Sequence, residues 1–170
     1  MHIFWYRRDL RTFDNTALLH AFEENKEVQP IFIFDKNIVE ELESNDARIN
    51  FIYTHLHKID LELKKYGSSL KVYYGNPVDV FREICRKVTV DSVYTNHDYE
   101  PYAINRDLGV KEVLQDFGVP FSTFKDQVIF ERDEVVKNDG KPYTVFTPFE
   151  NRWLLRFHET ECKVNTNSNF

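Results

Sequence analysis

"HIFWYRRDLR", residues 2–11, sets a short apolar run of β-forming side chains directly against a run of charged ones. Runs that are apolar on both faces are typical of strands in parallel sheets, because helices cover both sides of such sheets. Four further runs have the same character: VQPIFIF (28–34), LKVYY (70–74), SVYTN (92–96) and PFSTF (120–124). The sequence therefore predicts five buried parallel strands.

Helical patterns separate the predicted strands. In residues 46–66 apolar side chains recur every three or four positions, as on one face of an amphipathic helix, and residues 102–117 form a second such stretch; a glycine follows each. Asn76 and Pro77 form a typical helix start. Alternating strands and helices imply right-handed βαβ units. We therefore predict an α/β fold: a single, doubly wound, Rossmann-like domain whose five-stranded parallel sheet has the order 3-2-1-4-5.

The region after residue 124 has a different pattern. A turn signal, NDG at 138–140, is followed by two prolines and a short helical stretch. We expect residues 125–157 to fold back over the edge of the sheet and to complete a domain of residues 1–157. Residues 158–170 end in the polar stretch KVNTNSNF, and we expect them to begin a linker to a further domain.

The composition excludes several classes of protein. The 170 residues carry a formal charge of −6, whereas a nucleic-acid-binding domain is expected to have a basic footprint. The two cysteines have neither metal-ligand spacing nor the pattern of a disulfide framework, which favours a reducing cytoplasm. No apolar run approaches the roughly 20 residues of a membrane-spanning helix. We expect a monomeric, cytoplasmic chain without membrane contact.

The residues directly after the strands are the best candidates for a ligand site, because open parallel sheets bind ligands beyond the carboxyl ends of their strands. They include Asp35 after the second strand, and Asp98 and Glu100 after the fourth. Two interpretations fit the charged loop after the first strand: a ligand-binding loop, or a salt-bridged loop that leads to a helix N-cap at Asp14 or Asn15. This loop contains Arg7, Arg8, Asp9 and Arg11.

Motifs for catalysis and for metal binding are missing from the sequence. It has no Gly-x-Gly-x-x-Gly, no phosphate-binding loop and no serine on a glycine-flanked turn. The six histidines are scattered, and His55 and His57 point to different faces of a predicted helix. Arg106 and Asp107 are expected to tie their helix to neighbouring loops. The residues alone predict a ligand cleft without catalytic residues and without a metal site.

Four stretches follow one another along the chain: FWYRRDLRTFDNTAL (4–18), YTNHDYEPYAINRD (94–107), FKDQVIFERDEV (124–135) and GKPYTVFTPFENRW (140–153). In order and spacing all four resemble the DNA photolyase and cryptochrome family. The resemblance is to the family's N-terminal α/β domain, which holds a light-harvesting antenna pigment. The family's larger helical domain, which binds FAD and damaged DNA, has no counterpart in these 170 residues.

The resemblance implies a function. A deoxyribodipyrimidine photolyase uses light and reduced FAD to split cyclobutane pyrimidine dimers in DNA, a carbon–carbon lyase reaction in which the cofactor carries the chemistry. This chain then resembles the light-harvesting domain of such an enzyme. Its expected partner is the enzyme's own C-terminal FAD domain, which is also the part that contacts damaged DNA. We expect no catalytic residue and no repair activity in this chain alone.

The resemblance also indicates the type of antenna pigment. Family members with a folate antenna have a histidine in the loop after the second strand and an Asn-Glu pair in the helix after the fourth. Here that loop reads ELESNDAR (41–48), and Tyr102 and Ala103 occupy the place of the pair. This departure argues against folate.

The pattern is closer to family members that bind a flavin or deazaflavin in this domain. Those members hold the pigment with an aspartate before the Tyr-Glu-Pro-Tyr stretch and with an arginine at the start of the helix after the second strand. The resemblance therefore implies a planar pigment in a cleft with aromatic faces and a few polar groups, or an empty cleft where the second domain is needed for binding. The implied cleft residues are Phe34, Asp35, Arg48, Phe51, Asp98 and Glu100.

Two other functions share these features. A cryptochrome blue-light photoreceptor has the same domain and signals instead of repairing DNA. A stand-alone nucleotide- or flavin-binding α/β protein has a similar topology, and it would be favoured if the natural coding sequence ended near residue 170.

Overall fold

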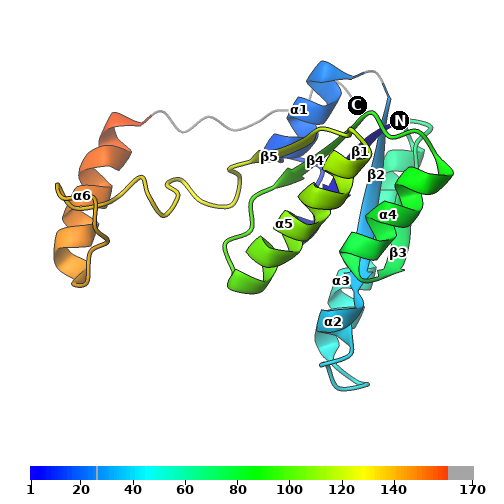
Figure 1. The fold of residues 1–170 in the computed structure, drawn as a ribbon. Coiled ribbons are helices and arrows are strands. Elements are labelled where there is room, and N and C mark those ends of the chain that lie inside the picture. The colour runs from blue at the N-terminus through cyan, green and yellow to red at the C-terminus, as the bar shows by residue number, and fades with distance from the viewer. Residues whose placement is uncertain (26, 161–170) are drawn as a thin grey trace.

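The five predicted strands pair side by side in one parallel sheet (Figure 1). The computed structural model describes residues 1–25 and 27–160. The strands are β1 (His2–Tyr6), β2 (Val28–Asp35), β3 (Lys71–Gly75), β4 (Ser92–Asn96) and β5 (Phe121–Phe124). Their order in the sheet is β3-β2-β1-β4-β5, so the predicted doubly wound α/β fold is confirmed.

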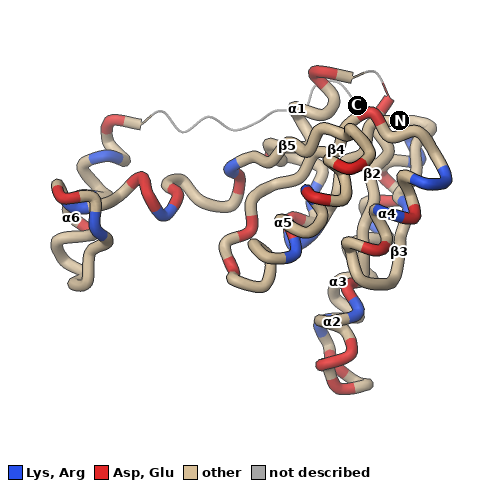
Figure 2. Tube along the Cα trace, viewed as in Figure 1, with Lys and Arg blue, Asp and Glu red and all other residues tan. Residues whose placement is uncertain are grey.

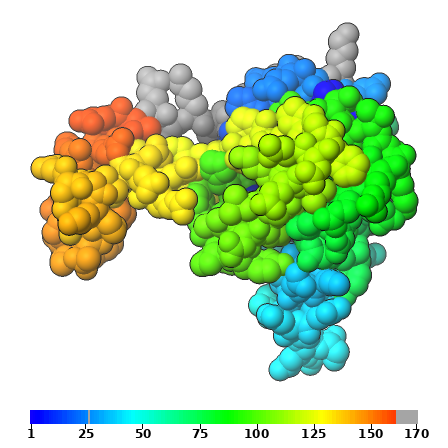
Figure 3. Space-filling view, viewed as in Figure 1, coloured from blue at the N-terminus to red at the C-terminus, as the bar shows by residue number. Residues whose placement is uncertain are grey.

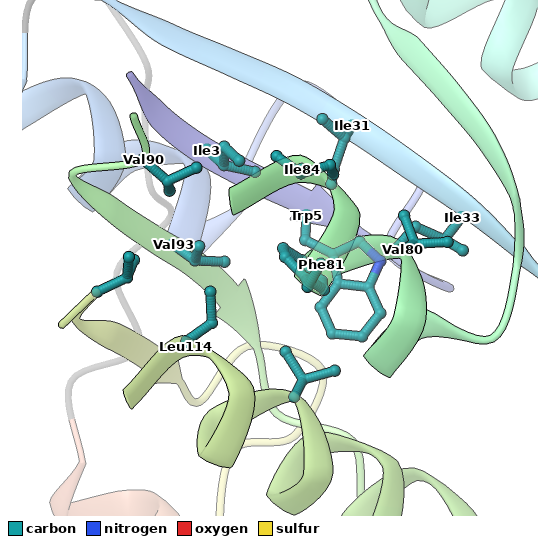
Figure 4. Close-up of a cluster of buried hydrophobic side chains, with 12 residues drawn as sticks. Ile3, Trp5, Ile31, Ile33, Val80, Phe81, Ile84, Val90, Val93 and Leu114 are labelled. Atoms are coloured by element: carbon teal, nitrogen blue, oxygen red, sulfur yellow. The ribbon is translucent and has the colours of Figure 1, made fainter. Parts of the chain in front are cut away.

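Alternate side chains of the central strand enter opposite faces of the sheet. The helices of the described residues are α1 (Thr16–Glu24), α2 (Lys36–Val39), α3 (Ala47–Lys64), α4 (Pro77–Lys87), α5 (Pro101–Asp116) and α6 (Phe146–Glu159). Ile3 and Trp5 pack under α4 and α5 (Figure 4), and Phe4 and Tyr6 pack on the other face against α1 and α3. These four side chains are at most 1% exposed, so β1 forms the centre of both core layers.

Local sequence signals set the helix starts. Asn15 accepts a hydrogen bond from the backbone N–H of Leu18 at 3.2 Å, so of the two N-cap candidates Asn15 caps α1, and Asp14 does not. Asn76 caps α4 in the same manner, with Pro77 as the first helical residue. Both starts use a side-chain oxygen to satisfy a backbone donor that the helix leaves unpaired.

Helix α2 was not predicted. It is a single turn whose N-cap Asp35 accepts a hydrogen bond from the backbone N–H of Asn37 at 3.1 Å. Four residues are too few to show a periodic apolar pattern, so a helix of this length leaves little trace in the sequence.

The chain directly after β5 follows the predicted path. Val135 is buried at 6% exposure, and the Tyr99 hydroxyl donates to the Glu131 carboxylate at 2.9 Å. Residues 125–135 are thereby attached to the edge of the sheet beside the carboxyl end of β4.

For α6 the prediction of a return over the sheet is wrong. None of its residues is buried, and it makes no extended contact with another described helix or strand. Figure 1 and Figure 3 show it as a lobe that stands away from the sheet. Trp153 stacks instead on Phe157, with ring centroids 5.1 Å apart, and meets Phe130 edge-on at 5.5 Å. The edge strand β5 is short and only partly buried, so it offers α6 little apolar surface.

The predicted linker, residues 158–170, lies largely outside the described residues and stays a prediction. Helix α6 includes the first two of these positions and ends at Glu159.

Charges of both signs are mixed along the described chain. Lys and Arg segments alternate with Asp and Glu segments over the helices and loops (Figure 2). Among the described residues, no helix combines the length and the apolar character that crossing a bilayer requires.

Candidate functional site

The charged loop after β1 is fixed by a buried polar network at the carboxyl edge of the sheet. The Asp9 carboxylate accepts hydrogen bonds from the backbone N–H of Arg7 at 2.8 Å and from the Asn96 side-chain amide. The Asn96 amide also donates to Asn15 Oδ1 at 2.9 Å, and its oxygen accepts from the backbone N–H of Ala17 at 2.9 Å. Because the buried Asp9 carboxylate accepts hydrogen bonds from Arg7, Asn15 and Asn96 of its own chain, Asp9 has a structural role.

Arg7 and Arg106 share the carboxylate of Asp107. Arg7 Nη1 donates to Asp107 Oδ2, and Arg106 Nε donates to Asp107 Oδ1 at 3.1 Å. The two arginine side chains are only 7% and 8% exposed. Burial lowers the pKa of the Arg7 guanidinium, although the neighbouring Asp107 opposes that shift. The ion pairs join the start of α5 to the loop after β1, which agrees with the structural role expected of Arg106 and Asp107.

A cavity of ≈ 460 Å³ opens beside this network. It lies between the loop after β1, the end of β2, and helices α2 and α3, and its volume is in the range of small-molecule sites. Apolar side chains from these elements form most of its wall, among them Leu10, Phe32, Ile38 and Ile52.

The structure brings five of the six predicted cleft residues to this cavity. Glu100 is the exception: its side chain is 64% exposed and lies 3.0 Å from Arg8 in an ion pair. The role of the six residues in ligand binding stays a prediction. Those that line the cavity are Phe34, Asp35, Arg48, Phe51 and Asp98.

Both aspartates of the cavity have partners within the chain. Asp35 accepts a hydrogen bond from the Tyr102 hydroxyl at 2.6 Å, and burial together with this bond raises the pKa of Tyr102. Asp98 lies 3.4 Å from Arg8 Nε and 3.8 Å from Arg106 Nη2. Tyr102 thus links α5 to the end of β2 across one side of the cavity.

Arg48 already has a carboxylate partner. Its guanidinium donates to Asp46 through Nε at 2.9 Å and through Nη2 at 2.6 Å, and its side chain is 70% exposed. These hydrogen bonds lower the pKa of Asp46 to about 2. A ligand at Arg48 must therefore compete with Asp46 for the donor fork at the exposed rim of the cavity.

Trp5 and Arg106 also line the cavity and were not predicted as ligand residues, whereas Arg7 lies in the charged loop for which a ligand-binding role was one of two interpretations. The alternation along β1 places Trp5 in the core, and this hides its position at the cavity. The sequence did contain one indication that Trp5 lies near the ligand loop: side chains two residues apart on a strand point to the same face, so Trp5 points to the same side as Arg7. Arg7 indeed lies over the Trp5 ring, 5.2 Å from its centroid.

A second cavity, of ≈ 290 Å³, lies between α5 and β5. His97 Nδ1 is hydrogen-bonded to the Glu131 carboxylate at its wall, and His97 Nε2 lies 2.9 Å from Thr123 Oγ1. Asp98 is the one predicted cleft residue that it includes. The larger cavity is therefore the candidate site.

The chain matches the family model described as DNA photolyase over residues 2–165. It belongs to the DNA photolyase family. The predicted resemblance is thereby confirmed. This photolyase-family chain is 29% identical over 164 residues to the deoxyribodipyrimidine photo-lyase of a Synechococcus strain, which covers 96% of the chain and 34% of that relative. It is 26% identical to cryptochrome-1 of Sylvia borin, over 96% of the chain and 26% of that protein.

A solved photolyase is similar in both sequence and fold. The archaeal photolyase from Sulfolobus tokodaii is 33% identical, with a TM-score of 0.73 over 88% of this chain and 33% of that one. It was determined with two FAD molecules, with the implication of a novel light-harvesting cofactor. The chain spans about a third of the length of these two photolyases.

Proposed function

We propose that this chain is the N-terminal, light-harvesting domain of a deoxyribodipyrimidine photolyase. In the complete protein, light and reduced FAD split cyclobutane pyrimidine dimers, and a part outside these 170 residues binds FAD and damaged DNA. Family membership and the similarity to the Synechococcus enzyme support this activity. The observation that carries the light-harvesting role is the cavity at the carboxyl edge of the sheet, which five of the six predicted pigment-binding residues line.

The residues of the cavity suit binding better than catalysis. Asp35 and Asp98 both have partners within the chain, the Tyr102 hydroxyl and the Arg8 guanidinium. Among the described residues, no serine, cysteine or histidine lines this cavity. Serine, cysteine and histidine are frequent nucleophiles or proton-transfer groups in enzymes.

The pigment that we propose is a flavin or deazaflavin. The cavity fits such a group, because its wall combines aromatic faces from Trp5, Phe34 and Phe51 with a few charged groups. Tyr102 stands in the place of the family's folate-binding pair and is bound to Asp35. The two FAD molecules of the Sulfolobus photolyase support a flavin in this family. When bound, the pigment would absorb light and pass excitation energy to the FAD of the complete enzyme.

A cryptochrome photoreceptor is the alternative function, and the similarity to cryptochrome-1 of Sylvia borin favours it. The two functions differ in whether the complete protein repairs DNA.

The repair reaction tests the proposal. The complete gene product should restore ultraviolet-irradiated DNA under blue light and not in the dark, whereas this chain alone should not. The assay counts cyclobutane dimers before and after illumination. Blue-light signalling without dimer loss would identify a cryptochrome, and repair by the chain alone would contradict the assignment of the chemistry to another domain.

A further inference from the structure

Three buried donors at the cavity have no acceptor among the described residues: Trp5 Nε1, Arg7 Nη2 and Arg106 Nη2. Trp5 is 1% exposed, and the side chains of Arg7 and Arg106 are 7% and 8% exposed. In Figure 4 the indole nitrogen of Trp5 is turned to the side of Val80 and Ile33, and Ile33 also lines the cavity. Buried donors in folded proteins nearly always have an acceptor, and an unmet one is costly.

The remaining contacts hold the two guanidinium groups in place. Arg106 Nη2 lies 3.0 Å from Asp107 Oδ1, but without the geometry of a hydrogen bond, which Arg106 Nε makes to the same oxygen. Both guanidinium groups also lie over the Trp5 ring, at 5.2 and 5.1 Å from its centroid. Cation–π contacts and a shared carboxylate thus fix the three donors as one rigid group.

The charges of this group are already balanced. Arg7 and Arg106 face the carboxylates of Asp107 and Asp98, and Arg8, which also faces Asp98, is paired with Glu100 as well. What the group lacks is therefore hydrogen-bond acceptors and not negative charge. A phosphate would add an uncompensated charge here, whereas a carbonyl oxygen or a ring nitrogen would not.

The position of the three donors distinguishes them from a general packing defect. The Tyr6 hydroxyl is also buried without a partner among the described residues, but it lies in the core cluster on the opposite face of the sheet. The other three unpartnered donors belong to residues that line one cavity.

We propose that Trp5, Arg7 and Arg106 form the inner recognition end of the cavity and bind the carbonyl and ring-nitrogen acceptors of an uncharged planar heterocycle. Any phosphate of the ligand then remains at the rim, beside the exposed Arg48 and Arg8. This inference rests on the proposed pigment site and adds which side chains select the ring. These three act as binding residues, in addition to the structural role of their ion pairs.

The two tryptophans of the chain allow a direct test, because Trp5 lies at the cavity and Trp153 lies on α6. In an ¹⁵N-labelled sample of the full chain, the two indole N–H signals are assigned with Trp5→Phe and Trp153→Phe. The chain is then titrated with lumiflavin, FMN and a tetrahydrofolate. We expect lumiflavin and FMN to move the Trp5 signal downfield, as a new hydrogen bond does, and to leave the Trp153 signal in place.

A second measurement separates hydrogen bonding from ring-current effects. Infrared spectra of bound FMN should show higher carbonyl stretching frequencies in Trp5→Phe and in Arg106→Lys than in the unaltered chain, since each change removes a donor. Trp5→Phe should weaken the binding of lumiflavin and of FMN by the same factor, roughly three- to tenfold. The factor is the same because the lost hydrogen bond is to the flavin ring, which both ligands share. Trp153→Phe is the control and should change neither quantity.

The outcomes distinguish this inference from the proposed function. Flavin binding with an unmoved Trp5 signal and unchanged carbonyl frequencies would overturn the inference and leave the pigment site intact. A Trp5 response to the folate alone would support the inference and overturn the choice of a flavin. The absence of binding by all three ligands would overturn both.

Discussion

The two walls of the candidate cavity differ in how firmly the fold holds them. The inner wall comes from β1 and the start of α5, and its Trp5 is 1% exposed. The outer wall comes from α2 and α3, where Phe51 is 63% and Ile38 is 44% exposed. In the proposed pigment site, the firmly held inner wall would select the ring, whereas the exposed outer wall would contact the rest of the ligand.

The position of each wall in the fold explains this difference. Strand β1 is central, with β2 and β4 as neighbours and helices over both faces. Helix α2 is a single turn, and the connection from it to α3 is largely exposed. A side chain on the inner wall therefore contributes to stability as well as to binding, while one on the outer wall contributes mainly to binding.

The largest contrast in stability is expected between Trp5 and Phe51. Trp5→Ala leaves a large hole between the sheet and α4 and should lower the free energy of unfolding by about 3–5 kcal/mol. Phe51→Ala removes an exposed ring and should change it by no more than about 0.5 kcal/mol. Denaturant unfolding followed by circular dichroism measures both values. Similar losses in the two variants would contradict the distinction between the walls.

The half-buried carboxylate that pairs with two arginines of the inner wall gives the next largest effect. Asp107→Asn leaves Arg7 and Arg106 with less compensating charge and should cost about 2–4 kcal/mol of unfolding free energy. The matched control is Asp79→Asn on α4, where the ion pair with Arg82 is exposed. Exposed pairs contribute little, so this control should cost less than about 1 kcal/mol. If Asp107→Asn lowered the free energy of unfolding by no more than Asp79→Asn does, the ion pairs of Asp107 would contribute no more to stability than an exposed pair.

At the outer wall we expect an effect on binding without one on folding. Arg48→Ala should weaken the binding of FMN by about tenfold. The effect is no larger because Arg48 is exposed and is already hydrogen-bonded to Asp46. The same substitution should weaken the binding of lumiflavin, which has no phosphate, by less than about threefold. Fluorescence titration gives the dissociation constants. Equal losses for FMN and lumiflavin would place the ring, and not the phosphate, at Arg48.

The smallest effect concerns the protonation of Asp46. Arg48→Ala removes the side-chain hydrogen bonds that contribute most to holding the pKa of Asp46 at about 2, keeps the backbone N–H of residue 48, and should return the pKa part of the way toward its ordinary value. Because this pKa is lower in the folded chain than in the unfolded one, the stabilisation is present above pH ~4 and is lost as the pH falls toward ~2. NMR titration of the Asp46 carboxyl carbon checks the shift, with Arg82→Ala as control. An unchanged pKa in Arg48→Ala would show that this ion pair does not persist in solution.

The strands could be predicted from the sequence because each depends on a local pattern, and their order could be inferred from the alternation of strands and helices. Each buried parallel strand is a short apolar run, and helix signals such as Asn76 and Pro77 stand next to the residues that they organise. The place of Asp35 and Asp98 at the cavity follows from the same reasoning, since the carboxyl ends of parallel strands meet at one edge.

The inner end of the cavity could not be predicted in this way. It depends on side chains that are distant in sequence, such as Arg7 and Asp107, which are 100 residues apart. The contact between these side chains determines which hydrogen-bond donors have an acceptor and which have none. The direction of α6 was missed for a related reason: an apolar helix has the same pattern whether it packs on the sheet or on its own lobe, as Trp153 and Phe130 do.

The most direct test of the pigment site is to fill the cavity. Ile38→Trp places a large ring in its outer wall, and Val145→Trp places the same ring at an exposed position next to α6. Titration with FMN should give equal dissociation constants for the unaltered chain and Val145→Trp, and binding weaker by at least roughly tenfold for Ile38→Trp. Equal FMN affinity in all three proteins, or none in the unaltered chain, would contradict the assignment of this cavity as the pigment site.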